Sequence, residues 1–241
     1  MLTRIPSVDL NGVFAVAPDP PTAGIAASAL VASKQISGSF PWSIQLPGVP
    51  SPAIRAVAES YGLKTTERRS IYVLRLDRLL PAVTLPADTV LRRVSASRAD
   101  DFAAGLAMCW ESTRYFFRRL ATPEFLSLPG IAAWVAECNG EIIATAMGIA
   151  IDEWVTVMAV ATRPDQRRRG LGGAVTAAVL QDSARCGTRW AALTPTAGGA
   201  PLYRGMGFTK VGAVTVFSPD VPRSLSATRL PGRGGGAPSL P

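Results

Sequence analysis

Apolar and polar residues along the first third of the chain predict two strands and two helices. Residues 11–17 have the pattern of a strand, and residues 20–35 that of a helix with prolines near its start, where a missing N–H costs little. A second helix is predicted within residues 51–63, with Gly62 in the usual position after its end. Its apolar face comprises Ile54, Val57, Ala58 and Tyr61. Residues 69–79 then alternate like a strand, with Ile71, Val73 and Leu76 set against Arg75 and Asp77.

The middle and last thirds predict a longer series of elements. A short strand begins at Thr89, and a helix is expected to open at Ser97 with two aspartates in its first turn. Strands are predicted at 131–137 and 141–151, joined by a hairpin turn in which Asn139 and Gly140 supply positive φ angles. The next strand, 153–162, is apolar almost throughout, which suggests that both of its faces are covered. A helix after Gly170, a strand at 189–196, a short helix at 200–208 and a last strand at 210–217 complete the order.

These patterns divide the chain into four parts. Residues 1–80 form a first unit, residues 81–88 a linker bracketed by prolines, residues 89–222 a second unit, and residues 223–241 a tail rich in glycine and proline that we expect to be flexible. Residues 56–76 and 200–217 both run helix, glycine, apolar residue, polar residues, strand. Duplication and chance are both consistent with this internal similarity.

Composition narrows the classes of function. With 48% apolar and 17% charged residues the chain is globular. It has no histidine, which excludes histidine bases, Ser-His-Asp triads and histidine-ligated metals. Cys109, Cys138 and Cys186 have neither a disulfide framework nor zinc spacing, so we expect no metal and a reducing compartment. No apolar run approaches the roughly 20 residues of a membrane helix, and Asp9 interrupts any signal-peptide pattern. A soluble, cytoplasmic protein with no membrane partner is expected.

The net charge of +8 is concentrated in the last third of the chain. Residues 1–160 contain 14 basic and 14 acidic residues, whereas residues 161–241 contain 11 basic and 3 acidic residues. Such a balance is compatible with nucleic-acid binding. Its concentration around one short segment favours a specific anionic ligand instead, and the basic third lacks the interleaved aromatic residues of a single-strand binding platform. We therefore expect no nucleic-acid partner.

That segment, RPDQRRRGLGGAVTAAVL at 163–180, can form an anion site. Glycines that open a helix leave backbone N–H groups unpaired at one spot, and the helix dipole adds positive potential there. The three arginines before Gly170 add charge that suits phosphate oxygens. A tight turn with solvated arginines is the structural alternative. A P-loop is excluded because no Gly-Lys-Ser/Thr is present, and the dinucleotide fingerprint fails because Thr176 stands at its third glycine.

Two motifs together resemble the GNAT superfamily of N-acetyltransferases. The first is the acyl-CoA-binding pattern Gln/Arg-x-x-Gly-x-Gly/Ala, which stands here as Arg167, Arg168, Arg169, Gly170, Leu171 and Gly172. The second is the later Leu-Tyr-x-x-x-Gly-Phe, which runs from Leu202 to Phe208. The resemblance covers about residues 88–220. It implies an α/β GNAT acyl-CoA N-acyltransferase fold, with a mixed, mostly antiparallel sheet flanked by helices. Residues 1–80 are similar, more weakly, to the degenerate GNAT-like lobe of two-lobed members.

The resemblance also implies a site and a reaction. Acetyl-CoA, as co-substrate and without a metal, would donate its acetyl group to a primary amine by direct attack in a ternary complex. The cofactor-binding residues would be Val160, Ala161, Thr162, Arg167, Arg168, Arg169, Gly170, Leu171, Gly172 and Gly173. Tyr203 would be the general acid that returns a proton to the CoA sulfur, with an aromatic anchor as its structural alternative. The expected partner is a small-molecule or peptide amine, and a homodimer is compatible with the sequence.

Some catalytic details stay open in the sequence. Relatives with a carboxylate base on this strand carry it at the position of Thr156, which cannot serve. Asp152 and Glu153, at the start of the strand, either act as the base in place of residue 156 or are polar residues of the hairpin turn. Aromatic residues of the early helices either line an acceptor pocket or pack in the core; these are Trp110, Tyr115, Phe116 and Phe117. A non-catalytic acyl-CoA-binding regulatory module is the alternative function.

Overall fold

The structure is a computed structural model, and it describes residues 5, 7–17, 19–36, 40–77 and 85–220. Its strands are β1 (Gly12–Phe14), β2 (Ser43–Pro47), β3 (Thr65–Arg75), β4 (Thr89–Arg93), β5 (Ile131–Cys138), β6 (Glu141–Ile151), β7 (Trp154–Thr162), β8 (Trp190–Leu193) and β9 (Thr209–Ser218). Its α-helices are α1 (Thr22–Ile36), α2 (Pro52–Ser60), α3 (Ala99–Cys109), α4 (Arg114–Leu120), α5 (Pro123–Leu126), α6 (Leu171–Arg185) and α7 (Ala200–Gly205). Short 3₁₀ turns occupy Ala96–Arg98 and Pro164–Gln166.

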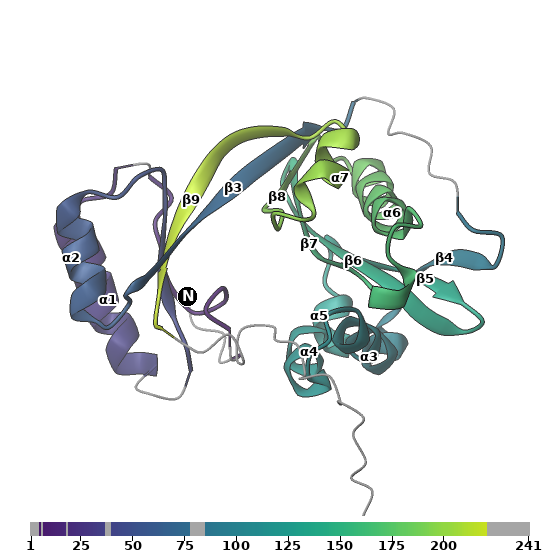
Figure 1. Cartoon of the computed structure of the whole chain (residues 1–241), viewed down its shortest axis with the longest axis horizontal. Coiled ribbons are helices and arrows are strands. Elements are labelled where there is room, and N and C mark those ends of the chain that lie inside the picture. Colours follow the sequence, from purple (N-terminus) through teal and green to yellow (C-terminus); the bar gives the residue numbers. More distant parts are fainter. Residues whose placement is uncertain (1–4, 6, 18, 37–39, 78–84, 221–241) are drawn as a thin grey trace, which may run out of the picture.

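All described strands belong to one sheet, in the order β1-β2-β9-β3-β8-β7-β6-β5-β4. Only β1–β2 and β7–β8 pair in parallel, and the other neighbours are antiparallel. In Figure 1, β3 and β9 cross as an arch between the α1–α2 side and the α6–α7 side. The mixed, mostly antiparallel α/β sheet flanked by helices that the sequence predicts is thereby confirmed.

The sheet contains two copies of one pattern, with their last strands exchanged. The order β1-α1-β2-α2-β3 repeats as β7-α6-β8-α7-β9, and each copy begins with a parallel strand pair. However, β9 pairs with β2, and β3 pairs with β8, so each copy receives its third strand from the other. The internal similarity seen in the sequence is therefore a structural repeat. The sheet runs without a break through both units expected from the sequence.

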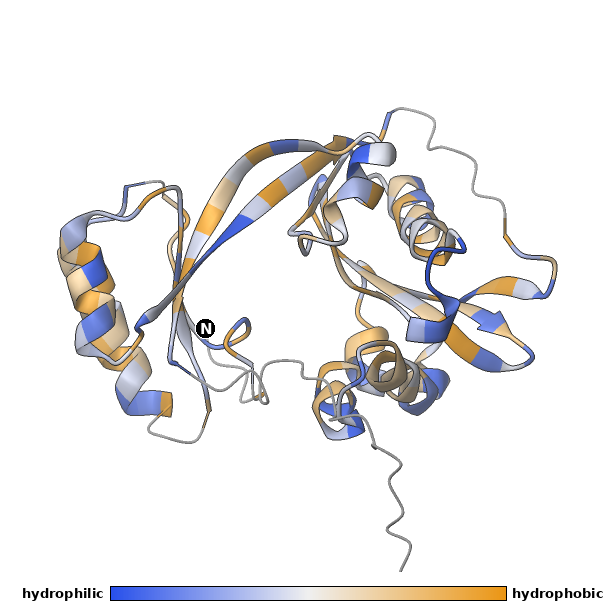
Figure 2. Ribbon diagram, in the orientation of Figure 1, coloured by the Kyte–Doolittle hydropathy of each residue, from blue (hydrophilic) through white to orange (hydrophobic). Residues whose placement is uncertain are grey.

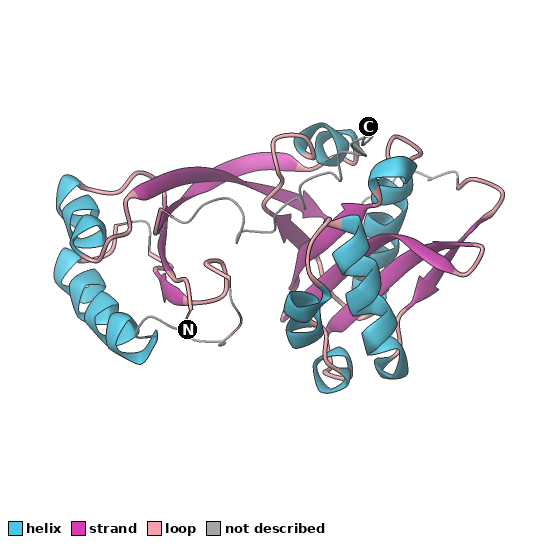
Figure 3. Cartoon of the chain, turned by 60° about the horizontal axis from the view of Figure 1, so that its bottom comes forward, coloured by secondary structure: helices cyan, strands magenta, loops and turns pink. Residues whose placement is uncertain are grey.

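Three apolar clusters hold the layers together. One joins α1 and α2 to β2 and Phe217, and a second joins α3–α5 to β5 and β6. The third packs α6 and α7 against the centre of the sheet and contains Tyr203. Figure 3 shows the strands passing between these groups of helices. Val155 and Val157 of β7 are buried on the α6 side, whereas Met158 packs on the α3 side. We call the α3 side the inner face of the sheet.

Local expectations from the sequence fare differently. The hairpin turn is confirmed, because Asn139 and Gly140 have φ angles of 50° and 80° between paired strands. Gly62 follows α2 with φ 75°, as expected. The helix predicted to open at Ser97 begins instead at Ala99, because residues 96–98 form a 3₁₀ turn.

The prediction that both faces of residues 153–162 are covered is wrong for the first half of β7, and in β3 the sequence did not indicate which face is covered. In β3 the buried side chains are Tyr72 and Leu74, whereas Ile71 and Val73 are half-exposed on the face that carries Arg75. The helices that cover β3 lie on the Tyr72 side, so alternation identified the strand but not its covered face. In β7 the inner face is open at Trp154 and Thr156, so only one face of its first half is covered.

Two predicted segments lie largely outside the described residues. Residues 81–84 of the linker and residues 223–241 of the tail belong to the parts of the chain that the structure does not describe. Across the described ranges, no helix is both long and apolar enough to cross a membrane.

Candidate functional site

β7 loses its partner on one side halfway along its length. It pairs with β8 only at Trp154, Val155 and Thr156, whereas its pairing with β6 continues to Thr162. From Val157 to Thr162 no described strand borders β7 on the β8 side. We call this stretch the unpaired edge of β7. Its main chain is free to pair with an extended ligand in the manner of an added strand.

A β-bulge interrupts the unpaired edge. Ala159 and Val160 together stand opposite the single residue Ala146, and Ala159 has a φ of 55°. The Thr145 hydroxyl, which is fully buried, donates a hydrogen bond to the Ala159 carbonyl at 2.9 Å and fixes the bulge. Positive φ is uncommon outside glycine and marks stored strain, which concentrates at functional sites.

The ladder beyond the bulge determines where each main-chain group points. The Arg163 N–H donates to the Ile143 carbonyl at 2.9 Å, so residue 163 faces β6. Because antiparallel pairs alternate, Ala161 also faces β6, whereas Thr162 and Val160 direct their N–H and C=O groups to the open side. The main-chain groups of Val160 and Thr162 thus face the open side, where the Thr162 carbonyl accepts a hydrogen bond from Arg167.

The segment after β7 leaves a row of backbone donors free. Arg168 and Gly170 have φ angles of 68° and 78°, and Gly170 caps α6 with no side-chain hydrogen bond. The first α-helical bond runs from the Ala174 N–H to the Gly170 carbonyl. Within the described part of the chain, the N–H groups of residues 167–173 have no acceptor. Figure 2 shows this hydrophilic segment entering the apolar helix α6.

Two glycines in the first turn of α6 leave room that the protein itself does not use. Gly172 and Gly173 have ordinary helical φ angles. A Cβ at Gly172 would lie 3.4 Å from a Leu202 methyl and 3.6 Å from the Thr162 hydroxyl, and one at Gly173 would lie 3.4 Å from Leu202. These are normal contacts, so nothing in the chain requires glycine there, although glycine weakens a helix. Close approach of a ligand to the main chain is the remaining physical reason.

The arginines around this turn differ in how they are held. Arg163 is mostly buried and pairs with Glu141 at 2.6 Å and with Asp165 at 2.7 Å. These bonds from Arg163 hold the pKa of Asp165 well below its usual range. Arg163 therefore stabilises the turn and is not free for a ligand.

The three motif arginines are more accessible. Arg169 bonds to Gln166 and lies 3.3 Å from Asp88, and Arg167 donates to the Thr162 carbonyl at 3.3 Å. Arg168 is exposed and forms no ion pair with any described residue. A ligand at the α6 N-terminus would meet one unpaired guanidinium and two that are held by weak surface contacts.

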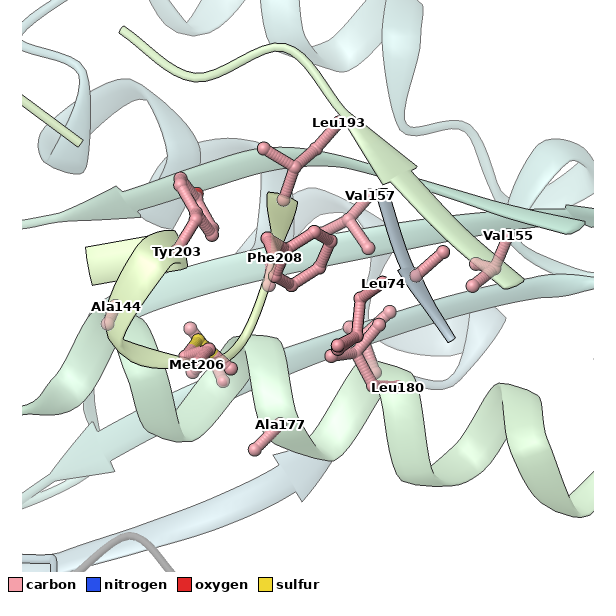
Figure 4. Close-up of a cluster of buried hydrophobic side chains, with 14 of the residues drawn as sticks. Leu74, Ala144, Val155, Val157, Ala177, Leu180, Leu193, Tyr203, Met206 and Phe208 are labelled. Carbon is pink, nitrogen blue, oxygen red and sulfur yellow. The ribbon is translucent and has the colours of Figure 1, made fainter. Parts of the chain in front are cut away.

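Tyr203 lies behind the first turns of α6. It is 7% exposed and packs edge-to-face on Phe208, with ring centroids 5.8 Å apart. Figure 4 shows Tyr203 beside Phe208 and Leu193 in the central apolar cluster. Burial raises the pKa of the Tyr203 phenol to about 12, although a hydrogen bond with Thr176 acts in the opposite direction. Thr176 in turn donates to the Gly172 carbonyl at 2.7 Å, so the phenol is linked to the turn that opens α6.

The candidate bases do not lie at the bulge. Thr156 is exposed on the inner face, and Asp152 and Glu153 form the β6–β7 turn, where Asp152 has a φ of 52°. Glu153 lies 3.4 Å from Arg189. Glu153 precedes Val160 by seven residues, which corresponds to about 23 Å of strand. The two acidic residues therefore occupy the opposite end of β7.

The aromatic residues of the early helices are divided between core and surface. Phe117 is 4% exposed and packs edge-to-face on Phe116. Tyr115 is 65% exposed and lies against Arg119. Trp110 packs on the α3 cluster, and its buried ring N–H has no partner in the described residues. No shared pocket for these four side chains is evident from their contacts.

The sequence interpretation missed three features of this region. These are the bulge at Ala159, the bond between Thr176 and Tyr203, and the stacked pair Trp154 and Trp190. Alanine has no preference for positive φ, so nothing local marks the bulge. The tryptophans come together only because β7 and β8 pair in parallel at that point.

Residues 129–210 match the protein family described as "Acetyltransferase (GNAT) domain". No curated protein matches the chain in sequence. Solved structures with a similar fold include a GCN5-related N-acetyltransferase from Kribbella flavida, with 23% identity and a TM-score of 0.65 over 87% of this chain and 81% of that one. Another, from Sphaerobacter thermophilus, has 16% identity and a TM-score of 0.59 over 81% and 67%. A conserved protein of unknown function from Staphylococcus epidermidis ATCC 12228 has 14% identity and a TM-score of 0.62 over 91% and 89%.

Proposed function

Residues 129–210 are a GNAT acetyltransferase domain, which makes the chain a member of the GNAT superfamily, and from that premise we propose that it transfers an acetyl group from acetyl-CoA to a primary amine. The observation that carries the proposal is the meeting of two free main-chain surfaces. The unpaired edge of β7 ends at Thr162, and the free N–H groups of residues 167–173 follow after one short turn. An extended arm followed by a diphosphate is the ligand that needs both surfaces in this order.

Each part of the site has one role in the proposal. The pantetheine arm pairs with Val160 and Thr162, and Ala161 holds these two residues in place through its bonds to β6. The N–H groups of Arg168 to Gly173 grip the diphosphate, and Leu171 contributes its free N–H. Arg167, Arg168 and Arg169 supply the charge that neutralises it. The open first turn at Gly172 and Gly173 lets the phosphates approach the main chain.

The proposed reaction requires few further groups from the chain. Acetyl-CoA supplies an activated acyl carbon. The Val160 N–H at the bulge polarises its carbonyl oxygen and stabilises the negative charge that develops there. The amine attacks in a ternary complex and loses its proton to water. Tyr203, whose raised pKa keeps the phenol protonated, gives a proton to the departing sulfur. The acceptor is a small-molecule or peptide amine, and the proposal needs no metal.

One observation favours a second candidate. Asp152 and Glu153 lie at the opposite end of β7 from the bulge, and Thr156 stands where a base is expected. A non-catalytic acyl-CoA-binding regulatory module would have the same CoA surfaces and no need for a base. Amines that arrive unprotonated can react without one, so the two functions differ in turnover and not in binding.

Calorimetric titration with CoA, followed by thiol release from acetyl-CoA over a diverse amine panel, tests the proposal. We expect saturable binding and turnover with at least one class of amine. Binding without turnover supports the regulatory module. If CoA does not bind, or if a complex has the N–H groups of residues 167–173 bonded to the protein's own carbonyls, both functions fail.

A further inference from the structure

The inner face of the sheet carries a row of four side chains, two of them tryptophans, that the proposed reaction does not use. Trp190 of β8 stands directly between Arg75 of β3 and Trp154 of β7, and Trp154 stands opposite Ile151 of β6. Directly paired residues project from the same face of a sheet. These four side chains therefore form one row across four strands.

The two tryptophans in this row form a stacked pair. Their ring centroids are 5.6 Å apart and their planes differ by 19°. The Arg75 guanidinium lies 5.7 Å from the centroid of the Trp190 ring. Trp154 is nevertheless 45% exposed, and Ile151 is 68% exposed. Trp190 is half-buried between Arg75 and Trp154, so it supports the exposed ring of Trp154. Large aromatic side chains presented in this way dominate binding surfaces.

This surface is continuous with the proposed acyl-transfer site. Thr156 lies on the same face, two residues after Trp154, and it is the last residue of β7 that pairs with β8. The unpaired edge of β7 begins at the next residue. Trp154 precedes Val157 by three residues and Val160 by six, which correspond to about 10 Å and about 20 Å of strand. A molecule lying on the tryptophans can therefore extend to the bulge.

The charges around the row indicate what kind of molecule fits. Arg75 is paired with Asp77 at 2.7 Å, and Arg189 is paired with Glu153 at 3.4 Å. The rim is thus balanced, and the next row toward the bulge is Val73, Ala192 and Thr156, which carries no charge. A neutral, planar group suits this surface better than a second ion.

We propose that Trp154 and Trp190 form a platform that binds a planar aromatic group of the amine acceptor and so determines acceptor specificity. This inference rests on the proposed function. The reacting amine lies at the bulge, and the aromatic group lies one extended linker of about 15–20 Å away. Short peptides and long arylalkyl amines have this form.

The platform is tested with matched acceptors. The peptide amide GGGGF places a phenyl ring about 15 Å from its terminal amine, and GGGGA is its partner without the ring. A second pair of similar reach is 10-phenyldecylamine and decylamine. We expect each aromatic member to have a kcat/KM about tenfold above its partner. The ratio should fall to near one in Trp154→Ala and in Trp190→Ala and should be retained in Trp154→Phe. Phe14→Ala, which removes an exposed aromatic side chain in the other half of the sheet, should keep the ratio.

Binding is measured separately from turnover. CoA affinity should be unchanged in the Trp154 and Trp190 variants, because neither residue lies on the CoA surfaces. The stacked pair should give an exciton signal in circular dichroism, which GGGGF should perturb and GGGGA should not. Equal binding of both peptides to the wild type, or a preference for the ring that survives loss of both tryptophans, overturns the platform. Failure of CoA to bind overturns the proposed function alone, because the peptide signal is read without CoA.

Discussion

Replacement of Gly172 by alanine tests whether glycine at this position is required by the fold or by ligand binding. Alanine is favoured over glycine in a helix by about 0.8–1.0 kcal/mol, and the new methyl group would make only ordinary contacts with Leu202 and Thr162. The variant should therefore be more stable, by up to about 1 kcal/mol, which is a rise of about 2–4 °C in melting temperature for a chain of this length. Its methyl group points between Thr162 and Leu202, at the junction of the unpaired edge and α6.

We expect CoA affinity in this variant to fall about tenfold, which is 1.4 kcal/mol, because the methyl group keeps the phosphates from the main chain. Calorimetry with CoA and thermal unfolding without it measure the two effects. Gly24→Ala is the matched control, since Gly24 also lies in the first turn of a helix and has open space around it. It should gain similar stability with no change in CoA affinity. A Gly172→Ala protein that is stabilised and binds CoA as well as the wild type would refute the reasoning.

Three further changes test other parts of the structure. Tyr203→Phe should lower kcat about a hundredfold with CoA affinity unchanged, and unaltered turnover would remove the acid role. Because the pKa of Tyr203 is raised to about 12, the wild-type enzyme should keep the protonated phenol until the pH approaches that value. Asp165→Asn should lower stability to urea at neutral pH, because Arg163 depresses the pKa of Asp165 in the folded state. The difference in unfolding free energy from wild type should shrink as the pH falls below about 4, the pKa of aspartate in the unfolded chain. A difference that does not shrink at low pH would contradict this. Gly105→Ala places a Cβ 2.6 Å from the Ile142 Cγ2 atom and should cost about 1–3 kcal/mol in urea unfolding. Ile142→Ala, which removes Cγ2, should make the added cost of Gly105→Ala smaller; no loss from Gly105→Ala alone would mean that α3 and β6 adjust freely.

The elements around the site could be predicted from the sequence because their signals are local. Asn139-Gly140 encodes a hairpin turn in two residues, and Gly170 marks the start of α6. Tyr203 was predicted from a motif. A motif gives the order and spacing of residues, but it does not say which of them are buried. Its raised pKa depends on Phe208 and on the bond with Thr176, and these contacts exist only after α6 and α7 have packed.

Strand faces and partners could not be predicted, because they depend on what other elements cover. In β3, alternation indicated a strand but not its covered face, and the helices cover Tyr72 and Leu74. The sequences of β3 and β9 contain no local signal of their exchange between the two copies. A similar pattern at two places in the chain indicated the repeat, but pairing across the repeat is a property of the whole sheet.

The exchange gives the first copy a direct part in the site of the second. β3 borders β8, and its residues Tyr72 and Leu74 belong to the apolar cluster that contains Tyr203 and Phe208 (Figure 4). The same strand carries Arg75 to the tryptophan row. The first copy differs at the start of its helix, because the connection from β1 to α1 ends in two prolines, which have no N–H, where the second copy has Arg-Gly. Strand β3 of the first copy thus packs behind Tyr203, while the turn proposed to bind phosphate belongs to the second copy.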